Sequence, residues 1–467
     1  MRKILALTLF LTASVANADW FEELRQSGND QDLYRVLYHM PKGGDLHNHL
    51  SGSNFSEWMW DLALKEHDRG YQYYTKVRIE NCVDFGSDEY GRSPYFLLFR
   101  NITALEYDAL SDCEKSEHKR LQDLDDREKA GWMDSIRLDK PHEGRNEFFG
   151  THWTRMNSLG SNPWFQAETL FLNMQAFGEE GLSYLETQVS VHGMQYPDGT
   201  EVSAEETVEI LRERINAPDA QATGVTPRFQ ISILRFHPHA EDMLRYVYEF
   251  VHDHSDLFVA VNMVGREDND KGYPLRFLDT LRELRHQYGG VRLSIHAGEV
   301  DEPNYHVRDT LLLGADRIGH GNNLITDPDT MRLMRHGPYL VETNLISNLL
   351  LNYVNDYSEH PFPEYLRTGI PVALSTDDRG MWDSTMTDEF FVAVKEFNLS
   401  WKEIKLLSRN SLQYAFIEDD EKDRLLQDFE ARMTKFESSM QKYGLERVGK
   451  MPATRSFVCK RYELCQE

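Results

Sequence analysis

The sequence predicts an α/β protein: a (β/α)8 TIM-type barrel with an insertion after the first strand and extra helices at the C-terminal end. First, after Thr151, short apolar runs rich in β-branched residues alternate with stretches that have the spacing of amphipathic helices. Second, there are eight such runs, counted from the segment that contains His47 and His49. Third, polar residues close several runs, and barrels of this class place their active sites at the carboxyl ends of the strands.

An open, doubly wound sheet is the alternative, but no G-x-G-x-x-G motif follows any run. After the first strand, the predicted strands are 182–191, 228–235, 257–264, 291–296, 315–319, 339–344 and 371–376. Helical patterns separate them at 204–215, 239–254, 275–288, 305–313, 329–335 and 364–368.

Two further regions flank this pattern. Residues 61–145 show no clear alternation, and we expect an insertion with helices and one disulfide staple. A charge run between Asp112 and Lys129 is expected to form a solvated helix face. Residues 388–467 are strongly helical up to Gln441. They should pack around the barrel, which makes residues 19–467 a single domain.

The N-terminus has the pattern of a secretory signal peptide. Arg2 and Lys3 precede a mostly apolar run over residues 4–15, and Ala16-Asn17-Ala18 is a typical cleavage site. The run is too short to span a bilayer. We therefore expect residues 1–18 to be removed from an exported protein, periplasmic or secreted. A net charge of 51 − 77 = −26 disfavours binding to nucleic acid or to anionic membranes.

The cysteines agree with export. There are four, Cys82, Cys113, Cys459 and Cys465, and an even number in an exported chain suggests disulfides. Four cysteines permit three pairings, and their order along the chain favours Cys82–Cys113 and Cys459–Cys465; free buried thiols are the alternative. No C-x-x-C motif supports a thiolate zinc site or a redox site.

The chemistry begins with a His-x-His in the first strand. Because side chains alternate along a strand, His47 and His49 point to the same side. Two neutral imidazoles on one face can share a metal ion, and they suit Zn²⁺. In a chain with 18 histidines, this pair alone is weak support for a metal site.

Three later strands also end in titratable residues. The fifth ends in SIHAGE with His296 and Glu299, the sixth in RIGHG with His320, and the eighth in STDD with Asp377 and Asp378. Burying such groups without a function is costly. Any one of them could be structural, but the ordered set points to one site at the end of the barrel.

The segments MPKGGDLHNHLSG, SIHAGE, RIGHG and STDD, in this order between about Met40 and Asp378, resemble the adenosine deaminase family of the amidohydrolase superfamily. Ser347-Asn348-Leu349 and residues 360–369 also resemble it. The exported N-terminus, MPKGG and the insertion are most similar to the secreted, growth-factor-related branch.

The resemblance implies the roles of the site residues. His47, His49, His296 and Asp377 would bind one Zn²⁺ per chain. His320 would orient the metal-bound water and take its proton, and Asp378 would hydrogen-bond the water or the purine. Glu299 would be the general acid that protonates the ring nitrogen. The backbone N–H of Gly265, after the fourth strand, would contact the purine, although a glycine there can equally mark a tight turn.

Two positions depart from the family pattern. Ser51 stands where many adenosine-acting members have an aspartate that contacts the ribose, and Arg379 stands where a proline often follows the paired aspartates. We therefore expect Ser51 to bind the sugar less strongly, helped by the insertion or by the region of His152 and Trp153.

The expected function is a zinc-dependent deaminase of adenosine or 2′-deoxyadenosine, working as a monomer or homodimer on a small purine nucleoside. One alternative is a related barrel metal hydrolase that acts on adenine, another aminopurine or an amide. The other is a binding protein that has lost catalysis on the same scaffold. The complete set of ligands and acid disfavours this last possibility.

Overall fold

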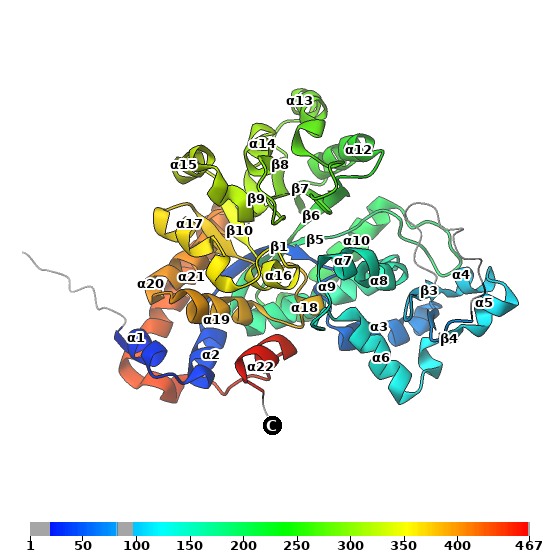
Figure 1. Ribbon diagram of the computed structural model, residues 1–467, viewed down its shortest axis with the longest axis horizontal. Helices are drawn as coiled ribbons and strands as arrows, with labels where there is room; N and C mark the ends of the chain where they lie inside the picture. The colour runs from blue at the N-terminus through cyan, green and yellow to red at the C-terminus, as the bar shows by residue number, and fades with distance from the viewer. Residues whose placement is uncertain (1–18, 81, 83–96, 466–467) are drawn as a thin grey trace, which may run out of the picture.

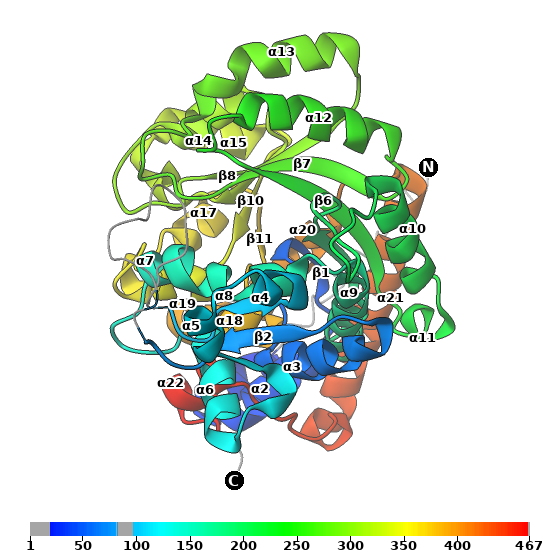
Figure 2. The same ribbon diagram turned by 90° about the vertical axis from the view of Figure 1, so that its right-hand side faces the viewer.

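The computed structural model describes residues 19–80, 82 and 97–465, so the predicted signal peptide lies outside the described residues. Within these ranges no helix is both long and apolar enough to cross a membrane. The centre of the molecule is a sheet of eight parallel strands surrounded by helices (Figures 1 and 2). The predicted (β/α)8 barrel is confirmed.

The strands follow one another around the barrel in the order in which they occur along the chain. They are β1 (Gly43–His49), β5 (Leu182–Gln188), β6 (Thr226–Leu234), β7 (Phe258–Val264), β8 (Arg292–Ala297), β9 (Arg317–His320), β10 (Leu340–Thr343) and β11 (Val372–Leu374). All eight predicted strands are present, with ends that differ by a few residues. They are almost entirely buried, as expected for parallel strands that are covered on both faces.

The last strand meets the first through residues of the predicted site. Asn48 and Asp377 form a parallel β-bridge. The N–H of His49 donates to Asp377 O at 3.2 Å, and the N–H of Asp377 donates to His47 O at 2.9 Å. The barrel therefore closes at the carboxyl ends of β1 and β11.

The outer helices fit the predicted periodicity. They are α10 (Ala204–Ile215), α12 (Ala240–Asp253), α13 (Leu278–Gln287), α14 (His306–Leu312), α15 (Pro328–His336) and α17 (Phe362–Thr368). A further helix after β10, α16 (Leu345–Leu350), was not predicted. In α10, Ser203 caps the first turn through the N–H of Glu206, and Val208, Leu211 and Ile215 form a buried stripe. The predicted helix 275–288 is a 3₁₀ turn, η4 (Pro274–Phe277), followed by α13.

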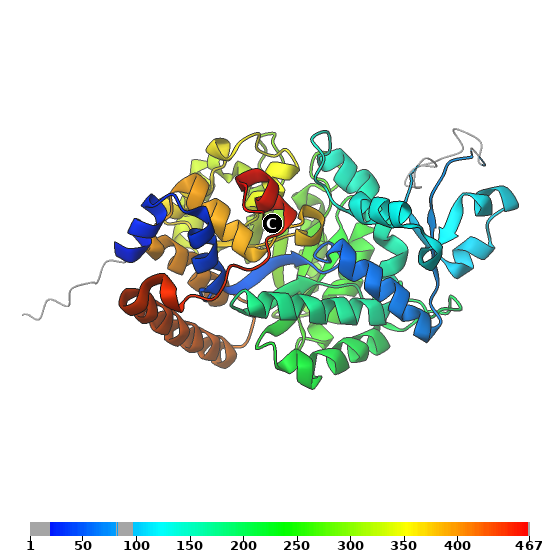
Figure 3. The ribbon, with the colours of Figure 1, turned by 90° about the horizontal axis from the view of Figure 1, so that it is seen from below.

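The insertion contains more than the predicted helices. It holds a small antiparallel sheet, β2 (Tyr73–Lys76), β3 (Asn101–Thr103) and β4 (His118–Arg120), in the order β3-β2-β4. The predicted helices and disulfide are present, but these strands were not predicted, because strands of three or four mixed residues show no alternation. The helices here are α4 (Ala104–Asp108), α5 (Asp112–Ser116) and α6 (Asp126–Ile136), and the charge run supplies capping boxes to α5 and α6. Figure 3 shows the insertion projecting from one side of the barrel.

The segment between the insertion and β5 contains helices that the sequence analysis did not assign. These are α7 (Arg145–Glu147), a π-helical turn η3 (Phe148–His152), α8 (Trp153–Gly160) and α9 (Pro163–Glu179). Asn162 caps α9 through the N–H groups of Trp164 and Phe165, and Pro163 occupies its first turn. Also present are α3 (Ser56–Lys65) after β1 and α11 (Pro218–Gln221) after α10.

The terminal helices pack together on one side of the barrel (Figure 1). They are α1 (Asp19–Gln26), α2 (Asp30–His39), α19 (Met386–Phe397), α20 (Trp401–Gln413), α21 (Asp419–Tyr443) and α22 (Ser456–Tyr462). The short helix α18 (Arg379–Trp382) follows β11. One cluster of buried apolar side chains runs from Phe21 through the barrel to Leu464. The predicted disulfides Cys82–Cys113 and Cys459–Cys465 are both present, which confirms the local pairing.

Candidate active site

Four residues from three strand ends meet at the point where the barrel closes. His47 and His49 come from β1, His296 from β8, and Asp377 follows β11. His49 Nε2 lies 3.3 Å from both His296 Nε2 and Asp377 Oδ1, and His47 Nε2 lies 3.6 Å from Asp377 Oδ1. One ligand atom from each residue falls within 4.8 Å of all the others. The spacing therefore allows a single metal ion to be held by all four.

The hydrogen bonds behind the imidazoles orient them toward this point. His47 Nδ1 donates to Glu342 Oε2 at 2.8 Å, and His296 Nδ1 donates to Asn262 Oδ1 at 3.0 Å. Since these oxygens accept, each Nδ1 carries the proton and each Nε2 presents its lone pair. His47 Nε2 is buried without a hydrogen-bond partner in the described part of the chain. Three imidazole nitrogens and one carboxylate fit a divalent transition metal such as zinc.

Asp377 is fixed by its own surroundings. Ser347, on α16, donates its hydroxyl to Asp377 Oδ2 at 2.6 Å, which leaves Oδ1 directed at the imidazoles. The Asp377 backbone has φ +54°, a left-handed conformation that is uncommon for residues other than glycine. The barrel closure holds this backbone in place, and strained positions of this kind gather at functional sites.

His320 lies beside the four residues and is fixed by its own hydrogen bond. Its Nδ1 donates to Asn348 Oδ1 at 2.9 Å, and its Nε2 lies 3.8 Å from Glu299 Oε1. Burial lowers the pKa of His320 to about 4. The imidazole is therefore neutral near pH 7, with the lone pair of Nε2 available to accept a proton.

Burial has the opposite effect on two carboxyl groups of the site. It raises the pKa of Glu299 well above its usual value, and the charge of Asp377 adds to the effect. The same two causes raise the pKa of Asp378. A bound cation would offset the contribution of Asp377 but not that of burial. Tyr353 donates its hydroxyl to Glu299 Oε1 at 3.2 Å, which leaves Oε2 to carry an acidic proton.

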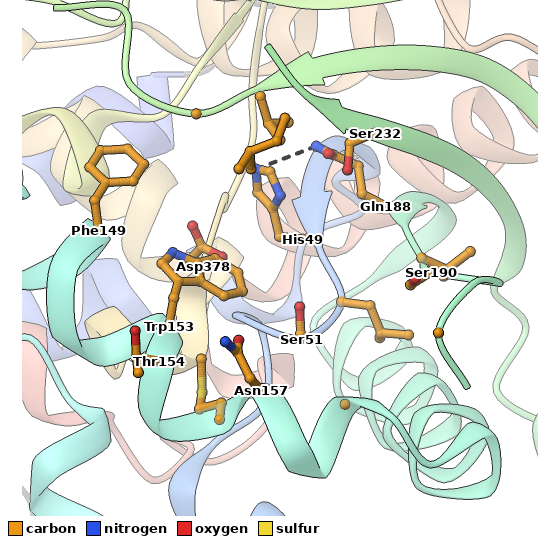
Figure 4. Close-up of a pocket in the computed structure, with 18 of the residues that line it drawn as sticks. His49, Ser51, Phe149, Trp153, Thr154, Asn157, Gln188, Ser190, Ser232 and Asp378 are labelled. Carbon is orange, nitrogen blue, oxygen red and sulfur yellow. Dashed lines mark hydrogen bonds between the residues drawn. The ribbon is translucent and has the colours of Figure 1, made fainter. Parts of the chain in front are cut away.

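A cavity of about 990 Å³ opens onto these groups at the carboxyl ends of the strands. His49, His296, Glu299, Asp377 and Asp378 form its floor, and Ser51 and Gly265 also line it. Its remaining walls are largely apolar, with Phe148, Phe149, Trp153, Met156, Ile231, Leu234, Phe236, Met243, Val247 and Val264 among the lining residues. Figure 4 shows Ser51, Trp153, Thr154 and Asn157 on the same side of the cavity as Asp378.

Of the two regions expected near the sugar, only the one around Trp153 contributes described residues to the cavity wall. None of the described residues of the insertion, 61–145, lines the cavity, whereas many residues between Asn146 and Ser161 do. Trp153 lines it as expected. His152 does not, because its two ring nitrogens lie 3.0 Å from Glu147 O and 3.2 Å from Arg137 O, in a buried position behind the wall.

The structure also accounts for Arg379. Its side chain is buried away from the cavity, donating to Glu180 Oε1 at 3.1 Å and to Asn173 Oδ1 at 2.8 Å, and it lies over the ring of Phe177. Arg379 therefore ties α18 to α9. The sequence analysis missed the supporting residues Glu342, Asn262 and Tyr353, although a glutamate inside the apolar strand β10 was a signal that could have been used.

Comparison with known proteins places this arrangement in a family. The family model described as adenosine deaminase matches residues 166–432, more than half of the chain. The chain belongs to the adenosine deaminase family. The match to the family confirms the resemblance, while the secreted, growth-factor-related branch stays a prediction.

Individual relatives are more distant. An adenosine deaminase of Enterococcus faecalis is 32% identical over 188 residues, 40% of this chain and 54% of that protein. An N6-methyl-AMP deaminase of Bos taurus is 26% identical over 255 residues, 53% of this chain and 71% of that protein. The chain spans about half the length of most of the curated relatives it matches.

Among solved structures, an amidohydrolase from Burkholderia ambifaria with bound Zn is similar in fold. Its TM-score is 0.59 at 16% identity, with 88% of this chain and 95% of that chain covered. At this identity the likeness extends to the fold alone.

The four converging residues should bind a metal ion in the purified protein. Purified protein should contain about one divalent transition metal ion per chain by elemental analysis. His296→Ala should lose most of this metal, because it removes one of the four proposed ligands. His239→Ala is the matched control, since that exposed histidine lies outside the site and should leave the metal content unchanged. Full metal content in His296→Ala, or none in active wild-type protein, would contradict the assignment.

Proposed function

We propose that the protein is a zinc-dependent aminohydrolase that converts adenosine and 2′-deoxyadenosine to inosine and 2′-deoxyinosine with release of ammonia. One observation carries the proposal: His47, His49, His296 and Asp377 converge at the floor of a cavity that also contains the buried carboxyl of Glu299. This unites a metal site and a proton donor at one place.

The proposed metal is Zn²⁺, held by the four converging residues. Three neutral imidazoles and one carboxylate leave an open position, at which the bound ion supplies a water of lowered pKa. The neutral His320 would accept a proton at Nε2 when the ion is bound, while its Nδ1–H stays bonded to Asn348. Asp378, at the cavity floor, hydrogen-bonds the water or the purine.

Glu299 is the proposed general acid. Deamination requires that the ring nitrogen beside the attacked carbon gains a proton as the aromatic ring is disrupted. A carboxyl whose pKa is raised by burial keeps its proton at neutral pH and can deliver it. Gly265 lines the cavity with φ +97°, and its backbone N–H is the proposed purine contact. A Cβ there would lie 2.7 Å from Phe236 Cε1, so the position also requires glycine for steric reasons.

The charge of the cavity favours a nucleoside over a nucleotide. Among its described lining residues, Arg266 is the only arginine or lysine. Its guanidinium already donates to both oxygens of Asp268, at 2.7 and 2.6 Å, and to Asn146 Oδ1 at 2.8 Å. Because this cation is neutralised, a phosphate would enter without a strong partner. The sugar of a nucleoside can instead meet Ser51 and the polar side chains of Thr154 and Asn157 (Figure 4).

Other activities fit less well. Free adenine lacks the remote contacts that help to position a reacting ring. A scaffold for binding alone has no need of a raised carboxyl pKa beside a complete ligand set.

We also propose that the protein is exported and acts as a single domain over residues 19–467. The two disulfides and the common apolar core support this.

Glu299→Gln tests the acid. This variant should keep its metal but lose about 10²–10⁴-fold in kcat, the usual contribution of a proton-transfer group. Since the protonated form of wild-type Glu299 is active, kcat/KM should fall as pH rises through its raised pKa, and this basic limb should vanish in the variant. Glu302→Gln changes an exposed residue of the same loop and is the control. Near-normal turnover in Glu299→Gln would exclude it as the acid.

The substrate class is tested by comparing kcat/KM for adenosine, 2′-deoxyadenosine, adenine and AMP on one preparation. The two nucleosides should lead. Ser51→Ala should lower kcat/KM for adenosine by about 2- to 10-fold, the size of one neutral hydrogen bond, and leave adenine unchanged. If adenine or AMP is the best substrate, the nucleoside assignment is wrong, although the metal chemistry could still hold.

A further inference from the structure

A buried ion pair, which does not line the cavity, holds the backbone turn that carries Glu299 through hydrogen bonds. Glu267, in the loop after β7, accepts the N–H of Gly298 at 3.1 Å on Oε2 and the N–H of Glu299 at 3.0 Å on Oε1. Arg235, the residue after β6, donates from Nη2 to the carbonyl of His296. Consecutive parts of the turn are therefore fixed by two side chains from neighbouring strand ends.

The two side chains also contact each other. Arg235 Nη1 lies 3.5 Å from Glu267 Oε1, and the side chains are 1% and 0% exposed. A buried ion pair contributes little net stability, because desolvation of both charges offsets their attraction. Both carboxylate oxygens of Glu267 accept backbone N–H groups of the turn. This geometry indicates that the ion pair positions the turn.

A third residue completes the arrangement. His306, at the start of α14, donates from Nδ1 to Glu267 Oε2 at 2.7 Å. Although burial alone would raise the pKa of Glu267, the hydrogen bond from His306 and the charge of Arg235 hold it below its usual value. The group is therefore an ionised carboxylate, which makes stronger hydrogen bonds to N–H groups than a neutral acid does.

The turn itself has little conformational freedom. Gly298 has φ +76°, and a Cβ at this position would lie 2.6 Å from Asn323 Oδ1. The direction in which the Glu299 side chain leaves the backbone thus depends on how this one turn is held. The carboxyl of Glu299, at the far end of the side chain, accepts the hydroxyl of Tyr353 and lies 3.8 Å from His320 Nε2.

We propose that Glu267, with Arg235, is a positioning residue that fixes the turn of residues 296–299 so that the carboxyl of Glu299 meets the ring nitrogen of the substrate. The inference rests on the proposed function, because it assumes that Glu299 delivers a proton. The negative charge of Glu267 also contributes to the raised pKa of Glu299. Glu267 does not touch the substrate; it acts through Glu299.

A double-mutant cycle tests this role with the full-length protein. Glu267→Ala should lower kcat for adenosine by about 10- to 100-fold, the effect typical of supporting residues around a site, with little change in KM. In a Glu299→Gln background the same change should have almost no further effect on kcat, because the group that it positions is already gone. Metal content should stay at that of the wild type in all four proteins.

Two further variants keep the test decisive. Glu267→Gln retains an amide oxygen that can accept from the turn, so it should recover part of the lost kcat and should remain folded if Glu267→Ala does not. Glu421→Ala is the control: it breaks a partly buried ion pair with Arg228, which lies near the start of β6, and neither residue contacts residues 296–299 in the described part of the chain. It should keep wild-type kcat.

Equal losses from Glu267→Ala in both backgrounds, full kcat in Glu267→Ala, or no recovery in Glu267→Gln would overturn the positioning role alone. If the wild-type protein itself shows no turnover of any aminopurine, the proposed function fails, and the positioning role fails with it. The two failures are thus told apart by the wild-type measurement.

Discussion

The barrel is closed by the backbone of the residues that the site needs. Asp377 exchanges hydrogen bonds with His47 and His49, so the same bonds that join β11 to β1 bring the carboxylate to the imidazoles. The ends of eight parallel strands converge at one face, which adds His296 and His320 from β8 and β9. Fold closure and site assembly therefore depend on one set of contacts, and a change that opens the barrel would also disperse the proposed ligands.

A buried network of charged and polar side chains lies inside the barrel and reaches the site. Glu342 accepts from His47 and pairs with Arg317, whose guanidinium also binds Glu186. From Glu186 the network continues through two amides, Gln230 and Asn262, and ends at His296. The imidazoles of His47 and His296 are thus oriented by one buried network. Such networks stabilise a single arrangement only when every member is satisfied, which explains why so many polar residues lie within the strands.

The sequence predicts most of the fold because apolar runs and helical spacing are local signals. The eight strands, the outer helices and both cysteine pairs could be read without any structure. It could not predict β2–β4, whose strands are too short to show alternation, or the wall formed by η3 and α8. The residues of the site likewise fall into those with a local sequence signal and those without one. Residues in short strand-end motifs were found. The roles of Glu267, Asn262 and Tyr353 were not, because they depend on partners 32 to 54 residues away along the chain.

The proposed reaction adds water to an adenine ring at one metal-dependent centre, so oxygen from water must appear in the product. Adenosine should be incubated with the protein in oxygen-18-labelled water, and the product analysed by mass spectrometry. The account predicts inosine that carries one labelled oxygen, no product after the metal is stripped with a chelator, and recovery on adding Zn²⁺. Labelled product from metal-free protein, or no labelled product from the metal-loaded protein, would contradict it.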